Sequence, residues 1–217
     1  LKYFLNTKAV NASASTAGIN ALIAGNLLIG TGEDFVFRFG TTAADPDSRH
    51  PKFAGQYTAG GGDYQSTDYM HHLTVEKGFD DPRVRYYLYR QVLTNTTNVD
   101  EQECISQIAP PHYLVGNYPY CNPAGNKGYW GRDHLDPDGI PPDGLKRTAY
   151  GVFPAGGRFD NSSGQPVANP ALGMKGAGIH PIMLAAYVDF MLAEATLTLG
   201  TTGTAKTYLQ NGIKKHM

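Results

Sequence analysis

The sequence has few charged residues and no excess of either sign. Of its 217 residues 17% are charged, and 18 Lys and Arg stand against 19 Asp and Glu, for a net charge of -1. No cluster of Lys or Arg is longer than two residues. The basic surface that nucleic-acid binding requires is therefore missing, and we expect no nucleic-acid partner.

Cysteine is scarce as well. Cys104 and Cys121 are the only two, and neither belongs to a CxxC motif or to a Cys and His pairing with the spacing of a zinc site. We expect no metal and no cofactor. The two cysteines either form a disulfide, which would contribute about 3 kcal/mol in the chain-entropy model, or remain separate thiols.

The sequence also lacks the motifs of several enzyme classes. It has no GxSxG elbow and no HExxH helix, and Gly30-Thr31-Gly32 lacks the third glycine of a dinucleotide-binding loop. Glycoside hydrolysis needs a pair of carboxylates across a cleft, and no spacing selects two of the candidate aspartates: Asp133, Asp136, Asp138, Asp143 and Asp160. We predict that the protein is not an enzyme, with a secreted glycoside hydrolase as the alternative.

Two patterns resemble metal sites without meeting their requirements. The segment from Asp133 to Gly139 spaces oxygen ligands like a calcium loop, but Leu145 stands where the EF-hand needs a bidentate Glu. It is an irregular cation site or an Asp/Pro/Gly turn. His71 and His72 lie close to Asp68, but adjacent histidines point apart on a regular backbone.

No apolar run is long and free of charge. The run after Pro181 contains Asp189 and Glu194, which disfavours a membrane span. It predicts instead a helix from Pro181 that ends at Gly200, with one apolar face formed by Leu184, Val188, Met191, Ala195 and Leu199. A second helix should follow, with Ala205, Tyr208, Leu209 and Ile213 as its apolar stripe and basic residues at its end.

Elsewhere the periodicity is weaker. The first residues read as helical, and a further helix is expected over 17–29, with Ile19 and Leu27 among its buried residues. Alternating segments predict strands over 34–39 and 84–89. The segments 40–78 and 95–175 read mostly as loop.

What the chain does have is glycine, proline and aromatic residues. It contains 26 Gly, 14 Pro and 14 Tyr, a composition typical of long polar loops that carry aromatic rings. The segment 128–134 combines Tyr129 and Trp130, the only Trp, with Arg132 and Asp133. Aromatic faces stack on sugars, and polar side chains form hydrogen bonds with sugar hydroxyls. We therefore predict that these four residues bind a glycan, together with Tyr64 and Tyr69. The alternative is that Trp130 anchors its loop.

Several segments, taken together and in order, resemble the SusD/RagB family, the nutrient-binding lipoproteins of Bacteroidetes. They are EDFVFRF from Glu33, DDPRVRYYLYRQ from Asp80, GYWGRDHLDPDGIPPDGLKRTAYGVFPAGGRFD from Gly128, and the two C-terminal segments PIMLAAYVDFMLAEA and AKTYLQNGIKKHM. The resemblance extends over most of the chain and rests on the order of the segments.

The resemblance implies a mainly α-helical, SusD-like fold with tetratricopeptide-like helices, long irregular loops and few short strands. Residues 1–217 would form the C-terminal portion of one such domain, with the N-terminal half and its lipid anchor outside this fragment. The implied function is non-catalytic binding of an oligosaccharide or glycopeptide on the extracellular face of the outer membrane. The implied partner is a SusC-like, TonB-dependent transporter, to which the ligand is delivered for nutrient uptake and polysaccharide utilisation. An adhesive surface protein is a further alternative.

Overall fold

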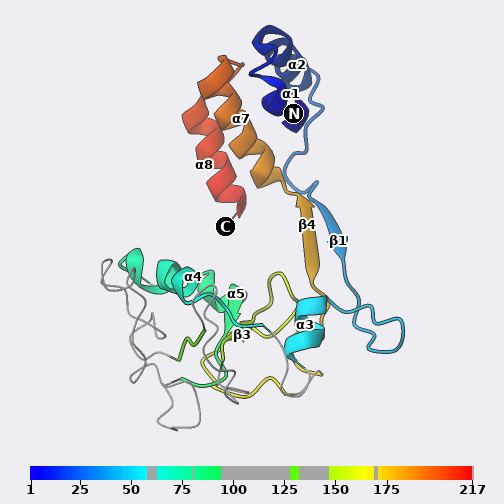
Figure 1. Ribbon diagram of the computed structural model, residues 1–217, viewed down its shortest axis with the longest axis vertical. Coiled ribbons are helices and arrows are strands. Elements are labelled where there is room, and N and C mark those ends of the chain that lie inside the picture. Colours follow the sequence, from blue (N-terminus) through cyan, green and yellow to red (C-terminus); the bar gives the residue numbers. More distant parts are fainter. Residues whose placement is uncertain (58–62, 80, 94–127, 132–146, 169–170, 217) are drawn as a thin grey trace. The chain divides into compact units, whose positions relative to one another are not determined.

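The computed structural model describes residues 1–57, 63–79, 81–93, 128–131, 147–168 and 171–216. The described part of the chain is mixed and mainly helical, with few short strands in small sheets. Its contacts divide the chain into two compact units (Figure 1). We call Leu1–Phe37 with His180–Met217 the terminal unit, and Arg38–Ile179 the central unit.

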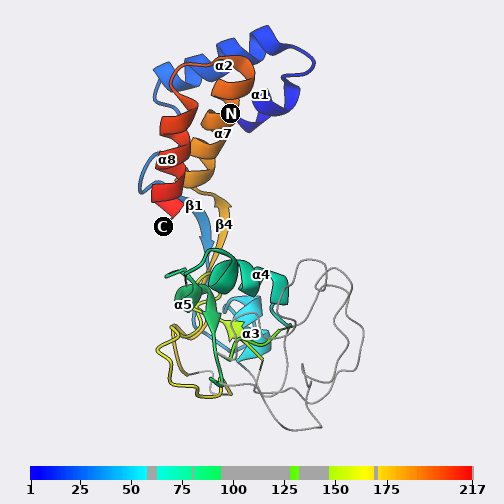
Figure 2. The ribbon, with the colours of Figure 1, turned by 90° about the vertical axis from the view of Figure 1, so that its left-hand side faces the viewer.

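The terminal unit contains helices from both ends of the chain (Figure 2). They are α1 (Lys2–Thr7), α2 (Ala12–Ala24), α7 (Ala185–Leu199) and α8 (Ala205–His216). Their shared core consists of Leu5, Ile19, Val188, Leu192 and Ala195. Apolar side chains from distant parts of the sequence therefore hold this unit together.

The helix pair α7 and α8 confirms the predicted C-terminal hairpin. Gly200 follows α7 with φ of 63°, the left-handed conformation that glycine adopts without strain. Lys215 of α8 forms a 2.7 Å ion pair with the buried Asp189 of α7. Gly212 lies so close to α7 that an added Cβ would come within 2.5 Å of the Phe190 ring. The absence of a side chain at Gly212 thus permits the close approach of the two helices.

Two details of the predicted hairpin are wrong. Pro181 lies in strand β4 (Ile179–Met183), which pairs with β1 (Phe35–Arg38), and α7 begins only at Ala185. There the carboxylate of Asp34 accepts a 2.7 Å hydrogen bond from the Ala185 amide, which caps the helix. The predicted stripe of α8 is also only partly buried, because Leu209 and Ile213 are each 48% exposed.

Helix α2 is displaced from the helix predicted over 17–29. The side chain of Asn11 accepts a hydrogen bond from the Ala14 amide, so α2 begins at Ala12 and ends before Gly25. Ile19 is fully buried as expected, but Leu27 lies beyond the helix and is exposed. A side-chain cap, and not the apolar spacing, sets the start of this helix.

The central unit holds short elements within irregular chain. Its helices are α3 (Pro51–Gln56), α4 (Thr67–His71), the π-helical turn η1 (His72–Glu76) and α5 (Val84–Tyr87), and its strands are β2 (Leu88–Tyr89) and β3 (Ala149–Tyr150). The strands pair antiparallel, with Leu88 opposite Tyr150. The helices α3, α4 and η1 correct the prediction of loop over 40–78.

Tyr57 connects several parts of the central unit. Its ring is fully buried and stacks on Phe53 with 4.3 Å between centroids. Its hydroxyl donates to the Tyr150 carbonyl and accepts from the Arg158 amide, both at 2.8 Å. Burial raises the pKa of this phenol, so it remains a neutral donor. These bonds hold α3, β3 and the segment after Gly157 in fixed register.

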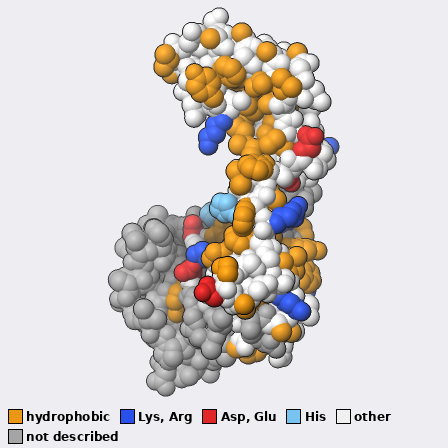
Figure 3. Space-filling model, turned by 90° about the vertical axis from the view of Figure 1, so that its right-hand side faces the viewer, with side chains coloured by type: hydrophobic (Ala, Val, Ile, Leu, Met, Phe, Trp, Pro, Cys, Tyr) orange, Lys and Arg blue, Asp and Glu red, His pale blue; other side chains and the backbone are white. Residues whose placement is uncertain are grey.

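No helix in the described ranges is long and apolar enough to cross a membrane. Hydrophobic side chains nevertheless reach the surface at many places (Figure 3), and among the described residues Phe35, Phe37 and Leu197 are more than half exposed. The strand that contains the two phenylalanines confirms the predicted extended segment.

Candidate ligand-binding site

The segment from Asp81 to Gln91 contains Arg85 and Tyr86, two residues of the candidate site. Its first turn is set by Asp81, whose carboxylate accepts hydrogen bonds from the amide of Arg83 at 3.0 Å and from its guanidinium at 2.9 and 2.7 Å. Arg83, and after it Lys77, hold the pKa of the Asp81 carboxyl far below its usual range. Asp81 is therefore ionised at neutral pH and fixes the entry into α5.

The helical turn of α5 corrects the prediction of a strand over 84–87, whereas β2 confirms the prediction for Leu88 and Tyr89. Val84 and Leu88 are buried, while Tyr86 is 52% exposed. An alternating strand would have placed all three on one face. The single helical turn of α5 instead leaves Arg85 and Tyr86 at the surface, while Val84 and Leu88, the first residue of β2, are buried in one apolar cluster.

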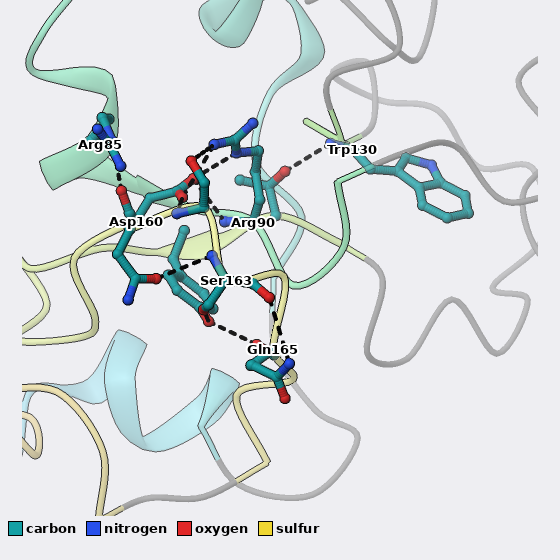
Figure 4. A network of polar contacts seen from close by, with 10 residues as sticks. Arg85, Arg90, Trp130, Asp160, Ser163 and Gln165 are labelled. Carbon is teal, nitrogen blue, oxygen red and sulfur yellow. Dashed lines mark hydrogen bonds and ion pairs between the residues drawn. The ribbon is translucent and has the colours of Figure 1, made fainter.

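A buried ion pair lies beneath this surface (Figure 4). The carboxylate of Asp160, which is fully buried, accepts from Arg90 Nε at 2.6 Å and Nη2 at 3.2 Å. It also accepts from the Ser162 amide at 2.8 Å. The Arg90 guanidinium in turn lies 4.9 Å from the centroid of the Tyr129 ring. The pair joins β2 to the loop after β3.

The same aspartate positions Arg85 through its main chain. The Asp160 carbonyl accepts a 2.6 Å hydrogen bond from Arg85 Nε, and its amide donates at 3.0 Å to the Arg85 carbonyl. This places Phe159 beside Arg85: the guanidinium carbon is 5.1 Å from the centroid of the Phe159 ring. Tyr86 packs edge-on against Phe159 at 4.8 Å. Since Phe159 is itself 39% exposed, these three side chains form an accessible surface, which we call the Arg85 surface.

Tyr129 and Trp130, two of the predicted ligand-binding residues, are buried. Their exposed fractions are 4% and 1%. The main chain of Trp130 is held by the side chain and amide of Thr148, at 2.7 and 2.8 Å. Neither ring offers an open face for stacking on a sugar, so the contacts favour the alternative that Trp130 anchors its loop. Their ligand-binding role remains a prediction.

Tyr64 and Tyr69 are more accessible. Tyr69, in α4, is 44% exposed, and partial burial raises the pKa of its phenol. Tyr64 is partly buried, with the Arg147 guanidinium 6.0 Å from its ring centroid. The predicted residues Arg132 and Asp133 lie outside the described residues, as do Cys104, Cys121 and four of the five candidate aspartates: Asp133, Asp136, Asp138 and Asp143.

The structure describes one candidate acid and the three candidate metal ligands. Asp160, the remaining candidate carboxylate, is buried and forms an ion pair with Arg90. His71 is buried, whereas the half-exposed His72 contacts Asp68 and Glu76 on either side of it along the chain. Over the described ranges no three His, Cys, Asp or Glu side chains gather as a metal site would require.

Sequence reasoning missed Arg85, Tyr86 and Phe159 as site residues. The segment 80–91 carries part of the family resemblance, and its alternating apolar residues favour a strand. A helical reading, with Val84 and Leu88 inward, would have placed Arg85 and Tyr86 outside. Phe159 had no comparable signal, because its neighbours lie more than 70 residues away in the sequence.

Comparison of the chain with protein-family models, curated proteins and solved structures finds no match.

Proposed function

We propose that this protein is a non-catalytic glycan-binding protein of the outer cell surface. It captures an oligosaccharide or glycopeptide and delivers it to a SusC-like, TonB-dependent outer-membrane transporter. In this proposal the chain has a SusD-like fold in which α7 and α8 are tetratricopeptide-like scaffold helices, and a lipid anchor outside this fragment attaches the protein to the membrane.

The observation that carries the binding role is the Arg85 surface. Tyr86 and Phe159 present apolar ring area beside a guanidinium whose Nε is already fixed by the Asp160 carbonyl. Sugars offer one apolar C–H face and a rim of hydroxyl groups, so a ring next to a donor matches both. Because the arginine is held in place before the ligand arrives, little conformational entropy is lost on binding.

The ion pair beneath the Arg85 surface also suits a binding site. The Arg90 and Asp160 ion pair is buried, so its geometry is not loosened by solvent. Substitutions at exposed positions above it should change ligand contacts without unfolding the unit. Tyr69 and Tyr64 are candidates for further ligand contacts, and Trp130 and Tyr129 would act by holding the loops.

Isothermal titration calorimetry against a panel of oligosaccharides tests the binding role. We expect a dissociation constant between micromolar and millimolar, which corresponds to about 4 to 8 kcal/mol. Tyr86→Ala and Phe159→Ala should each weaken binding about tenfold, since each removes stacking area.

The chain offers a matched control for these two variants. Tyr3 packs edge-on against Phe4 with 5.4 Å between centroids and is 71% exposed, but it belongs to the terminal unit. Tyr3→Ala should leave the affinity unchanged. Equal binding by wild type, Tyr86→Ala and Phe159→Ala would show that the Arg85 surface is not the site.

Two further assays test delivery and the absence of catalysis. A pull-down from outer membranes should recover a β-barrel transporter; recovery of fimbrial or host protein alone would favour an adhesive role. Incubation with polysaccharides should release no reducing ends, and release that one Asp→Asn change abolishes would favour the hydrolase.

A further inference from the structure

The two described segments that supply the Arg85 surface are unbalanced in charge. Residues 81–93 and 147–168 contain five arginines and two aspartates, with no lysine or glutamate. The chain as a whole has a net charge of -1. Positive charge is thus concentrated in the two segments that build the site.

Both aspartates of these segments are already engaged by other cations. Asp81 pairs with Arg83 and with Lys77, and Asp160 pairs with Arg90. Within the described ranges Arg85 makes no ion pair, and the one hydrogen bond of its side chain goes from Nε to a main-chain carbonyl. The charge of Arg85 is therefore not neutralised by a carboxylate of the described chain.

The geometry of Arg85 leaves its outer donors available. Nε is used by the Asp160 carbonyl, and the guanidinium lies over the Phe159 ring. The N–H groups of Nη1 and Nη2 have no acceptor among the described residues, and they form the fork that matches a carboxylate or sulfate. Tyr86, which is 52% exposed, packs edge-on against the same Phe159 ring that the Arg85 guanidinium covers.

We infer that the Arg85 surface selects an acidic sugar, one that carries a carboxylate or sulfate group. The acid accepts two hydrogen bonds from the Arg85 fork, and the apolar face of the same sugar packs on Tyr86. This inference rests on the proposed glycan-binding function and adds the class of ligand. A neutral sugar would leave the arginine charge without a counterion, so affinity should depend on the acid group.

The test uses pairs of oligosaccharides that differ only in the acid group. One arm compares oligogalacturonides with the same oligomers after reduction of their carboxyl groups to alcohols; a second arm compares sulfated with desulfated galactan oligomers. Wild type should bind an acidic member at least tenfold more tightly than its neutral partner. The arm in which this occurs identifies the group as carboxylate or sulfate.

Variants of Arg85 connect the preference to this residue. Arg85→Gln should lower the affinity for the acidic member about tenfold and leave the neutral one within twofold. Arg85→Lys keeps the charge but loses the fork, so an intermediate loss is expected. Arg38→Gln is the control, because Arg38 is an exposed arginine of the central unit whose loss should not matter. Circular dichroism verifies that each variant is folded.

The outcomes separate this inference from the proposed function. Equal affinity for acidic and neutral partners, or a preference that Arg85→Gln does not reduce, would overturn the inference and leave glycan binding intact. Failure of every oligosaccharide in the calorimetric panel to bind would overturn both.

Discussion

Replacing Asp160 by asparagine removes one partner of the buried ion pair beneath the candidate site. The change keeps the size of the side chain. The oxygen that accepts from the Ser162 amide, at 2.8 Å in the wild type, can still accept this hydrogen bond. The new amide group, however, faces Arg90 Nε, which is 2.6 Å from the present carboxylate oxygen. Two donors then oppose each other, and the Arg90 cation has lost the carboxylate of Asp160.

The expected loss of unfolding free energy is about 3 kcal/mol. Removing one partner of a buried ion pair costs roughly 3 to 5 kcal/mol, because the remaining charge is uncompensated. The lower figure applies here, since the Arg90 side chain is 13% exposed and retains the Ser162 hydroxyl at 3.0 Å. Its contact with the Tyr129 ring also persists.

Urea denaturation followed by tryptophan fluorescence measures this loss where it occurs. Trp130 is the only tryptophan, is buried, and lies in the central unit, so its emission reports unfolding of that unit. Asp63→Asn is the control, because the Asp63 and Lys52 side chains are 56% and 48% exposed. That variant should lose at most about 1 kcal/mol.

A double variant strengthens the test. Adding Arg90→Met to Asp160→Asn also removes the cation that faces the new amide and should restore part of the lost stability. If Asp160→Asn cost no more than Asp63→Asn, the reasoning that this ion pair supports the site would be refuted.

Two further predictions concern pH and helix packing. The lowered pKa of Asp81 means that its carboxylate stabilises the fold above its unfolded pKa of about 4 and that this stability is lost as the pH falls. Unfolding free energy measured between about pH 6 and about pH 3 should therefore fall less steeply in Asp81→Asn than in wild type; equal slopes would contradict this. Gly212→Ala should destabilise α7 and α8 by about 1 kcal/mol or more in thermal melts followed by circular dichroism, since its Cβ meets Phe190. Gly55→Ala, at an exposed position in α3 with open space around the added Cβ, should instead stabilise by up to about 1 kcal/mol; loss at Gly55 or gain at Gly212 would contradict the packing argument.

The C-terminal helix pair was predictable because its signals are local. Apolar residues at helical spacing predicted α7 and α8, and Gly200 marked the turn in the left-handed conformation found. The start of α7 was not predictable in the same way. Pro181 is compatible with a first helical turn and with an edge strand, and the decision depends on pairing with β1 and on the cap from Asp34.

The segment 84–89 shows how two periods can coexist in one short sequence. Val84, Tyr86 and Leu88 fit a strand, while Val84 and Leu88 alone fit a helix. The turn fixed by Asp81 and Arg83 selects the helix over the first four residues. A short apolar run does not decide between these periods without its tertiary partners.

The candidate site was the least predictable part. An aromatic pair such as Tyr129 and Trp130 has the same sequence whether it stacks on a ligand or fills a core, and burial distinguishes the two. The Arg85 surface depends on a contact between residues 74 positions apart. Neither composition nor local pattern contains that information.

Calorimetric titration of acidic oligosaccharides into wild type, Tyr86→Ala and Tyr3→Ala tests the central claim most directly. The account predicts micromolar to millimolar binding by wild type, a loss of about tenfold in Tyr86→Ala, and no change in Tyr3→Ala. Unchanged affinity in Tyr86→Ala, or an equal loss in Tyr3→Ala, would contradict the claim that the protein binds its ligand at the Arg85 surface.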